Sequence, residues 1–470
     1  MRRLNSVDNM FLKQENPTQP QHTIKAVVLD PAAAHQPLSF ETVRSAVPAL
    51  VEKVEPLRWQ LLLPRSGLGR PWWIERPQVD LDYHVKYATA EAPGGAHELS
   101  AQISEIVSVG LDRARPAWQL WYVDGLADGR IALVLKIHHA IADGLASVRL
   151  LETLFSADPA EPLPTVTRTL TDEQRPSTAA WLRTLAGHEV RTVARFPRVL
   201  VRSARSVKTS YRRRKAGLPG FVDAFAAPST RFNEPFTAER RFAYTTCDLD
   251  TIKEIKSAFG VTLNDVFLGV CSGALRCYLE RHGELTDESL TAVVPVAIRP
   301  PGEEVDWGNQ VTTWFVSLAT DVADPVERLK RIAANTSAAR AVHAERDLWL
   351  FGDWMDYWPL FWFYGRALPL LGARTKRRPT YSMTLSNVPG PKKQLYFAGA
   401  PIETLISVGP IIYPYGLNVT GWSYLDSMII AMQSSKYASK GQASDIWELV
   451  DGIPDAVAEL AALAVKRRSA

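Results

Sequence analysis

The feature that most constrains the fold is a short apolar run that ends in two adjacent histidines. The run "IALVLKI" is rich in β-branched residues, which predicts a buried strand, and it leads directly into His138 and His139. Three residues later come Asp143 and Gly144, and Gly144 allows a tight turn. The next segment, "LASVRLLETLF", has the apolar spacing of a helix. The sequence therefore predicts a strand, a turn and a helix, with ionisable side chains at the turn.

The two histidines cannot both point into one cavity, because successive side chains on a strand point to opposite faces. We expect one of them to be a catalyst or a ligand and the other a packed, hydrogen-bonded support. A neutral imidazole is the usual general base for activating a hydroxyl group. Asp143 either orients that histidine or holds the loop in a salt bridge. Zinc is the competing interpretation, but opposed side chains and the lack of an HExxH or cysteine set argue against it, so we predict no metal site.

The sequence offers no serine nucleophile to work with this base, since it contains no GxSxG motif. A histidine base without a protein nucleophile favours direct attack of a substrate hydroxyl on an activated acyl group. Such a reaction requires both substrates to be bound together. We therefore predict acyl transfer without a covalent intermediate on the protein.

Cysteine content and the N-terminal segment bear on the compartment. The three cysteines, Cys247, Cys271 and Cys277, show no metal-ligand spacing and are typical of free thiols, with the last two predicted on one helix. The first twenty residues lack the apolar core of a secretory signal, so we expect a cytoplasmic protein. No window reaches the roughly 20 apolar residues of a membrane span. The nearest, Trp349–Ala373, is aromatic and interrupted by charge, and it is interpreted as an interfacial element, the lining of an apolar pocket or a core helix.

Alternating strand-like and helical segments predict an α/β protein of two comparable halves. A stretch rich in Pro, Thr and Asp near residues 156–177 predicts a surface loop. We place the first half at residues 1–185, a basic crossover at 186–240 and the second half at 241–470. The crossover is longer than an ordinary connection, which indicates a function of its own.

The crossover carries a dense positive charge. Residues 190–215 hold ten Lys or Arg residues and no acid, although the whole chain has a net charge of only +4. Placed on a helix, five arginines form one stripe and five apolar residues the opposite one: Arg191, Arg195, Arg198, Arg202 and Arg205 against Val193, Phe196, Leu200, Ala204 and Val207. This pattern is typical of a helix lying in an anionic membrane surface, and equally of a solvated basic face above a core-facing stripe. Pro197 predicts a kink or break, and no motif accompanies the charge that would indicate nucleic acid.

The HHxxxDG motif is similar to the active-site motif of the CoA-dependent acyltransferase superfamily. Other segments resemble, in order, blocks of the bacterial wax ester synthase/acyl-CoA:diacylglycerol acyltransferase family. These segments are "LNSVDNMFLKQENPTQPQH", "LGRPWWIERPQVDLDYHV", "LDRARPAWQLWYVDGL", "TLNDVFLGVCSGALRCYL", "VVPVAIRP" with "WGNQV", and "LSNVPGP". The resemblance implies a two-domain, chloramphenicol-acetyltransferase-like α/β fold with the active site in a tunnel between the halves.

The resemblance also implies roles for individual residues. His139 would be the general base, with His138 as its supporting neighbour. Asp143 would point away from substrate and shape the loop, paired with Arg299 of "VAIRP". Asn264 would stabilise the oxyanion of the tetrahedral intermediate through its amide.

Four further positions match the family blocks. For Asp265, a catalytic role competes with a simple helix start in which Thr262 is the N-cap. Glu15 matches an acidic position near the active site and would contact the acceptor. Pro116 and Trp118 would shape the site, as structural members of the family's Pro-Leu-Trp segment.

The resemblance implies an O-acyltransferase that moves a long-chain acyl group from acyl-CoA to diacylglycerol, with long-chain alcohols as possible further acceptors and no bound cofactor. A membrane or lipid-droplet surface would be its partner, while the oligomeric state does not follow from the sequence. Two departures from the family leave room for a non-catalytic lipid-binding protein: Ala117 replaces the Leu of Pro-Leu-Trp, and Asp426 stands where Ser-Tyr-x-Gly has its Gly. A condensation-type enzyme is the alternative within the superfamily.

Overall fold

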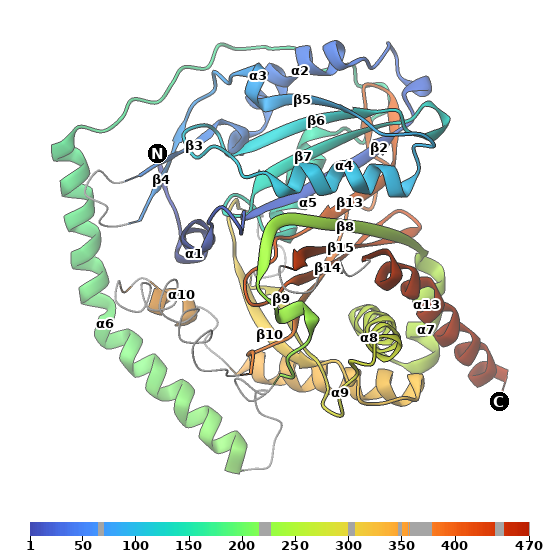
Figure 1. Cartoon of the computed structure of the whole chain (residues 1–470). Coiled ribbons are helices and arrows are strands. Elements are labelled where there is room, and N and C mark those ends of the chain that lie inside the picture. Colours follow the sequence, from blue (N-terminus) through green and yellow to red (C-terminus); the bar gives the residue numbers. More distant parts are fainter. Residues whose placement is uncertain are drawn as a thin grey trace.

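Two six-stranded mixed sheets form the framework of the protein, as its computed structural model shows (Figure 1). The structure describes residues 1–469 except 64–69, 216–226, 299–305, 346–349, 356, 358–377 and 438–445. The first sheet carries the histidine pair at the end of one of its central strands. In spatial order its strands are β12 (Tyr396–Phe397), β13 (Ala400–Val408), β2 (His22–Leu29), β7 (Ile131–His138), β6 (Trp118–Asp124) and β5 (Val85–Thr89).

Helices cover both faces of this first sheet, which explains why β2 and β7 are buried along their whole length. The helices concerned are α2 (Phe40–Lys53), α4 (Ala96–Ser108) and α5 (Gly144–Leu154). Lys136 of β7 points toward α4, where its ammonium donates to the carbonyls of Ile106 and Val109. Leu133 and Leu135 point to the other face, where they line a cavity together with side chains of α2 and α5.

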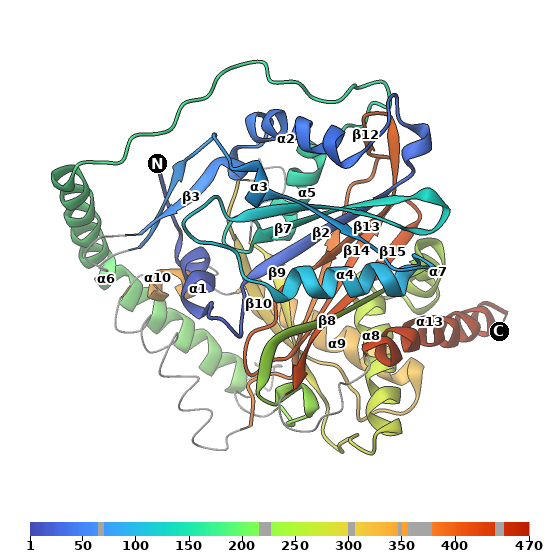
Figure 2. The same ribbon diagram turned by 45° about the horizontal axis from the view of Figure 1, so that its top comes forward.

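The second sheet supports the other half. Its strands are, in order, β10 (Val311–Ser317), β9 (Thr291–Ala297), β11 (Met383–Pro389), β14 (Leu417–Tyr424), β15 (Ser427–Tyr437) and β8 (Phe236–Asp248). The helices of this half are α7 (Leu249–Phe259), α8 (Leu263–Arg281), α9 (Pro325–Ala344) and α13 (Ile446–Ser469). Figure 2 shows the two sheets one above the other, with α4 lying across β8.

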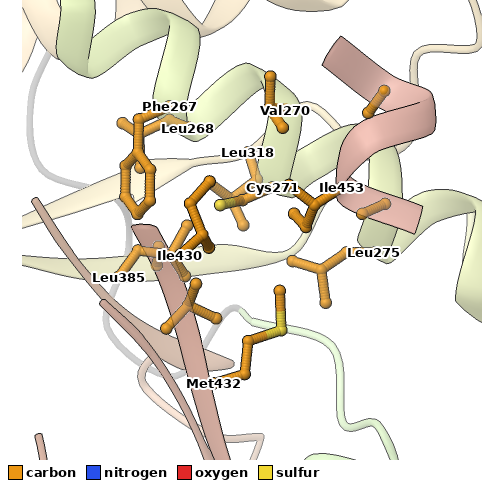
Figure 3. Packing of buried hydrophobic residues seen from close by; sticks show 14 of the residues in the cluster. Phe267, Leu268, Val270, Cys271, Leu275, Leu318, Leu385, Ile430, Met432 and Ile453 are labelled. Carbon is orange, nitrogen blue, oxygen red and sulfur yellow. The ribbon is translucent and has the colours of Figure 1, made fainter. Parts of the chain in front are cut away.

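Helix α8 forms the centre of the second core, because most of its side chains are buried. Phe267 and Leu268 lie over Leu385 and Ile430 of the sheet, as Figure 3 shows. Cys271 lies in the same cluster, and Cys277 is exposed on the same helix. The prediction that these two cysteines share one helix is confirmed.

Strand β13 joins the two halves. It follows β11 in the chain and precedes β14, both of which belong to the second sheet, yet it pairs with β2 in the first. The sequence division at residue 241 places β12 and β13 with the second half, whereas the structure places them in the sheet of the first half. The apolar alternation of β13 carries no signal that names its partner strand, so the exchange follows only from the structure.

Smaller elements surround these halves. They are the three-stranded sheet β1 (Arg2–Arg3), β4 (Trp72–Glu75) and β3 (Trp59–Leu62), with α1 (Ser6–Gln14), α3 (Leu81–His84), α6 (Thr178–Lys215) and α10 (Leu350–Met355). Helix α6 lies along the outside of the molecule, reached by an extended connection after α5 (Figure 1). It continues through Pro197 as one helix, so of the predicted kink or break no break occurs, and Figure 1 shows its axis changing direction near the middle, in agreement with a kink.

The strand predicted before the histidines and the helix predicted after them match β7 and α5 closely, and the segment predicted as a loop near residues 156–177 is irregular. The aromatic segment Trp349–Ala373 lies largely outside the described residues, apart from α10 and Tyr357. Among the helices described, none is by itself long and apolar enough to cross a membrane; α7 and α8 reach that criterion only together, across a bend of 103°. Over the same residues, no group of three His, Cys, Asp or Glu side chains could hold a metal ion.

Candidate active site

The end of strand β7 positions the two histidines differently. The His138 N–H donates to the carbonyl of Ala117, and the His139 N–H donates to the carbonyl of Gln21, both over 2.9 Å. Main-chain bonds on both sides therefore fix the backbone of the pair. The ring of Phe11 in α1 stacks on the His139 imidazole, with centroids 4.3 Å apart.

His138 is the packed member of the pair. Its Nδ1 accepts a hydrogen bond from the N–H of Ala140 over 3.1 Å, which assigns the ring proton to Nε2. This Nε2 faces the carboxylate of Glu15 at 3.6 Å. Arg113 pairs with the other oxygen of Glu15 at 2.6 Å. His138 is thus held between the turn that follows it and a buried carboxylate.

The charge of Glu15 is stable in this setting. Burial raises the pKa of its carboxyl group, but interactions with His138 and then Arg113 outweigh burial and lower the pKa to about 2. Glu15 is therefore ionised throughout the neutral pH range. It contacts the histidine that supports the site, and its position fits the sequence-based expectation of an acidic residue near the histidine pair.

His139 is the member of the pair that remains partly exposed. Its Nδ1 is buried without a hydrogen-bond partner among the described residues, while Nε2 is not enclosed in this way. Burial, and then the positive charge of Lys25, lower the pKa of His139 to about 4. At neutral pH the ring is consequently neutral.

Asp143 fixes the loop after the histidines. As the N-cap of α5 it accepts a hydrogen bond from the N–H of Ala146 over 2.9 Å, and its second oxygen accepts one from the N–H of Gln310 over 2.9 Å. Arg299, the predicted ion-pair partner, lies outside the described residues. The carboxylate of Asp143 thus joins the helix of the first half to the segment that leads into β10 of the second half.

Gly144 is required by close packing. A Cβ atom at this position would lie 2.7 Å from a methyl group of Val388 in β11, so the Val388 side chain occupies the space that a side chain at position 144 would need. The backbone of Gly144 does not adopt a positive φ. The tight-turn explanation given by the sequence is therefore wrong, and the contact between α5 and β11 replaces it.

A buried pair that the sequence did not single out holds the histidine loop from the far side. The Asn309 amide donates to the carbonyl of His139 over 2.7 Å and to the carboxylate of Asp8 over 2.8 Å, and the Asn309 N–H donates to the same carboxylate oxygen. Burial raises the pKa of Asp8 to about 7, although hydrogen bonds from Asn309 lower it. Both residues lie inside segments that carried the family resemblance, "LNSVDNM" and "WGNQV", which was the available signal.

Pro116 and Trp118 shape the strand beside β7. The Trp118 indole is almost fully buried and donates to the carbonyl of Leu57 over 2.8 Å. Pro116 forms an isolated bridge with Gln60 of β3. The carbonyl of Ala117, between them, accepts the hydrogen bond from the His138 N–H. The departure from Pro-Leu-Trp therefore lies directly beside the histidine pair.

Asn264 and Asp265 open helix α8 and have different environments. Asp265 forms a capping box with Thr262 and accepts a hydrogen bond from the Thr336 hydroxyl of α9 over 2.5 Å. These contacts give Asp265 a structural role. Asn264 is partly exposed, and its side chain makes no hydrogen bond within the described chain, so its amide is open to a ligand. Asp426 lies exposed in the turn between β14 and β15.

Lys25 is a third residue that the sequence did not single out. Its side chain is only 5% exposed, and its ammonium donates to the hydroxyls of Thr23 and Ser407 over 3.0 Å and 2.6 Å. The aliphatic part of Lys25 lines the apolar cavity between β2, β7, α2 and α5. A lysine inside an otherwise apolar strand gave a signal, because buried lysines are rare.

Comparisons with known proteins agree with this arrangement. The family described as wax ester synthase/diacylglycerol acyltransferase catalytic domain matches residues 4–267, and the C-terminal domain of that family matches residues 307–461. A putative diacylglycerol O-acyltransferase of Mycobacterium tuberculosis is 32% identical over 98% of this chain and 90% of its own length. The solved wax ester synthase/diacylglycerol acyltransferase of Marinobacter aquaeolei VT8 is 25% identical, with a TM-score of 0.68 over 98% of this chain and 99% of that one. The first condensation domain of the CDA synthetase, at 15% identity and a TM-score of 0.58 over 98% and 96% of the two chains, shares the fold.

Proposed function

The chain belongs to the wax ester synthase/diacylglycerol acyltransferase family, and from this premise we propose that it transfers a long-chain acyl group from acyl-CoA to the hydroxyl of diacylglycerol or of a long-chain alcohol. The observation that carries the proposal is the asymmetry of the histidine pair. The His138 ring accepts a hydrogen bond from the Ala140 N–H and has its Nε2 buried 3.6 Å from Glu15, whereas the His139 ring is neutral and belongs to a partly exposed residue. This is the arrangement that a general base for a hydroxyl group requires.

In this mechanism His139 Nε2 takes the proton of the acceptor hydroxyl while the hydroxyl oxygen attacks the thioester carbonyl. The tetrahedral intermediate then collapses, the C–S bond breaks, and the CoA thiolate leaves with the proton returned by His139. An ester and free CoA are the products. The protein forms no covalent bond, in keeping with direct attack between two bound substrates.

Neighbouring residues support this base without touching the reacting atoms. Glu15 and His138 hold the strand end, and Asp8 with Asn309 holds the carbonyl of His139. Asp143 ties the loop to the second half through Gln310 and, as the family resemblance implies, through Arg299.

We assign oxyanion stabilisation to the Asn264 amide, because it is partly exposed at the first turn of α8 and has no protein partner among the described residues.

The test is thiol release from palmitoyl-CoA with diacylglycerol or hexadecanol as acceptor. Wild type should show acceptor-dependent release, and His139→Ala should lower the rate by about 10²- to 10⁴-fold. The exposed His35 offers a matched control, since His35→Ala removes a histidine from another part of the chain. No release with either acceptor, from a protein that binds lipid, would favour a non-catalytic lipid-binding protein instead.

We further propose that the protein associates peripherally with the inner face of the cell membrane or with lipid droplets, through helix α6. All five apolar residues of the predicted stripe are exposed, Val193 and Val207 by more than two thirds. The neighbouring face of α6, which includes Val199 and Ser203, packs inward, where the Trp354 indole donates to the Ser203 hydroxyl, and Phe196 at the edge of the stripe also contacts the rings of Trp354 and Tyr357. An exposed apolar stripe opposite a basic one supports contact with an anionic lipid surface.

Binding to anionic liposomes tests this second proposal. Because Arg202 pairs with Asp353, the informative variant changes three other arginines of the stripe, all exposed: Arg195→Gln, Arg198→Gln and Arg205→Gln. Each positive charge near an anionic surface contributes about 1 kcal/mol, so the triple variant should bind at least about tenfold more weakly. A charge-matched control is Lys256→Gln with Lys392→Gln and Lys393→Gln, all exposed elsewhere. Equal liposome binding by both triple variants would show that the basic face of α6 is solvated and does not contact the membrane.

A further inference from the structure

Lys25 occupies a position in the first sheet that a lysine rarely takes. Its carbon chain lies against apolar side chains, and no carboxylate is within ion-pair distance in the described part of the protein. Burying an ammonium group without an ionic partner is costly, and burial lowers its pKa to about 7 although Asp143 raises it. A residue that costs stability at such a position indicates a role in the site.

The register of the sheet relates Lys25 to the histidine loop. On one face, Val27 stands opposite Leu133, Lys25 opposite Leu135, and Thr23 opposite Ile137. His139 follows next on that face, since its side chain is two residues beyond Ile137. The Lys25 row therefore lies roughly 13 Å from the His139 row along the strand, at about 3.3 Å per residue.

The side chain of Lys25 leans toward the histidine end of the sheet. Its ammonium bonds to Thr23, the next residue on this face toward His139, and lies 5.1 Å from the centroid of the Trp422 ring in β14. The charge acts on both His139 and Asp143. Its carbon chain meanwhile forms part of the cavity wall. Lys25 thus belongs both to the cavity wall and to the surroundings of the loop that carries the base, with Trp118, which stands opposite Ile137, lining the same cavity one row nearer to that loop.

The cavity itself has an apolar lining. Besides Lys25, the lining consists of apolar side chains from strands of the first sheet and from α2 and α5, with Leu57 and Phe397. Its free volume is about 30 Å³, which is room for one or two water molecules but not for an alkyl chain. Polar groups for recognising a headgroup are lacking in this lining. An unbranched hydrocarbon chain is the ligand chemistry that such a lining fits.

We propose that Lys25 controls chain length: it closes the apolar cavity toward His139, and moving or shortening it admits the distal end of a substrate alkyl chain. This inference rests on the proposed acyl transfer. The two hydroxyl contacts and the aromatic ring hold the ammonium without an ion pair, so a chain can displace it. An extended chain of about ten methylenes spans the distance between the two rows, so chains longer than this meet Lys25.

The experiment compares chain lengths on variants at position 25. Lys25→Ala opens the cavity, and we expect the ratio of kcat/KM for hexadecanoyl-CoA over decanoyl-CoA to rise about tenfold, a typical size for pocket-length discrimination. Lys25→Met keeps the length of the side chain without its charge and should leave the ratio within about twofold. Because both substrates are measured on one preparation, partial unfolding of a variant cancels in the ratio.

Two arms identify which substrate supplies the chain. In one, acyl-CoA length varies with hexadecanol fixed; in the other, alcohol length varies with palmitoyl-CoA fixed. The series in which the chain-length ratio changes shows whether the acyl donor or the alcohol acceptor supplies the chain. Adding Leu154→Phe to Lys25→Ala refills the cavity from α5, where Leu154 is partly exposed, and should return the ratio toward wild type.

The outcomes separate this inference from the function on which it rests. Turnover with an unchanged ratio in Lys25→Ala, in both arms, overturns the chain-length role and leaves acyl transfer intact. An equal shift in Lys25→Met and Lys25→Ala overturns closure by the side chain and assigns the effect to charge. No turnover by wild type with either acceptor overturns both the inference and the function.

Discussion

At the scale of single residues, His138 and His139 differ because the strand turns their side chains to opposite faces. His138 meets Glu15 and the N–H of Ala140, whereas His139 meets Phe11 and the field of Lys25. The first set of contacts fixes a tautomer, and the second keeps a ring neutral. Two identical residues, adjacent in sequence, therefore have different surroundings.

The neutral state of His139 predicts the pH dependence of the reaction. Because burial and then Lys25 lower its pKa to about 4, with His138 also lowering it and Asp143 raising it, the acid limb of kcat/KM should fall near pH 4. Below that pH the base is protonated and the rate declines. Lys25→Met removes a positive charge that disfavours protonation, so the limb should move upward, toward the ordinary value of 6.5.

A pH–rate profile of wild type and Lys25→Met from about pH 4 to about pH 8 checks this expectation. A limb near 6.5 in both proteins would show that His139 is solvated during turnover.

The lowered pKa of His139 also has a consequence for the stability of the protein. Between about pH 4 and 6.5 the unfolded chain binds more protons at this residue than the folded one, so its stability contribution is lost as pH falls through that window.

At the scale of elements, the segment before β10 and helix α1 together hold the histidine loop. Asp8→Ala leaves the buried N–H groups of Asn309 without their acceptor, which costs about 1 to 3 kcal/mol. The loss should appear in kcat more than in KM, since the carbonyl of His139 loses its support. Asp8→Asn keeps an acceptor oxygen and should lose less.

The raised pKa of Asp8 adds a distinguishing pH dependence. Its pKa of about 7 lies above the ordinary 3.8, so the stability linked to its protonation is present at acidic pH and is lost as pH rises through about 7. Thermal unfolding should therefore show that the stability of Asp8→Asn increases relative to that of wild type as the pH rises over this range. A constant difference across pH would mean that Asp8 is hydrated.

The contact of α5 with β11 gives a second prediction at this scale. Gly144→Ala places a methyl group 2.7 Å from Val388, and overpacking of this kind costs about 1 to 3 kcal/mol. The double variant with Val388→Ala should recover most of that loss in the free energy of unfolding. Gly187→Ala is the control, since nothing lies within 4 Å of the added atom and the substitution should stabilise α6.

Elements that local patterns define were predictable, and elements defined by distant partners were not. The strand and helix around the histidines, and the capping box of Asp265, follow from residues within a few positions of each other. Asn309 lies 170 residues from His139, so its hydrogen bond had no local signal. The apolar stripe of α6 was predicted, whereas its exposure depends on which other face packs inward.

At the scale of the whole molecule, strand β13 makes the two halves one folding unit. It enters the first sheet beside β2, while β11 before it and β14 after it belong to the second. Ile406→Ala, in the middle of β13 and fully buried opposite Ala26, should cost about 2 to 5 kcal/mol and lower the Tm of the entire protein. Calorimetry should show one transition moving as a whole. A second peak that stays in place would show that the halves unfold independently.

The shared strand also sets rules for recombining this protein with a relative. A crossover between two parents at the boundary near residue 240 would pair β2 from one parent with β13 from the other, across the whole Val408-to-Ile402 register. A chimaera that keeps the register intact has to take residues 396–408 from the parent that supplies the first half. Exchanging acyl or acceptor preference between two parents therefore needs more than one crossover point. Residues 396–408 have to come from the parent of the first half, although the chain on either side of them comes from the parent of the second half.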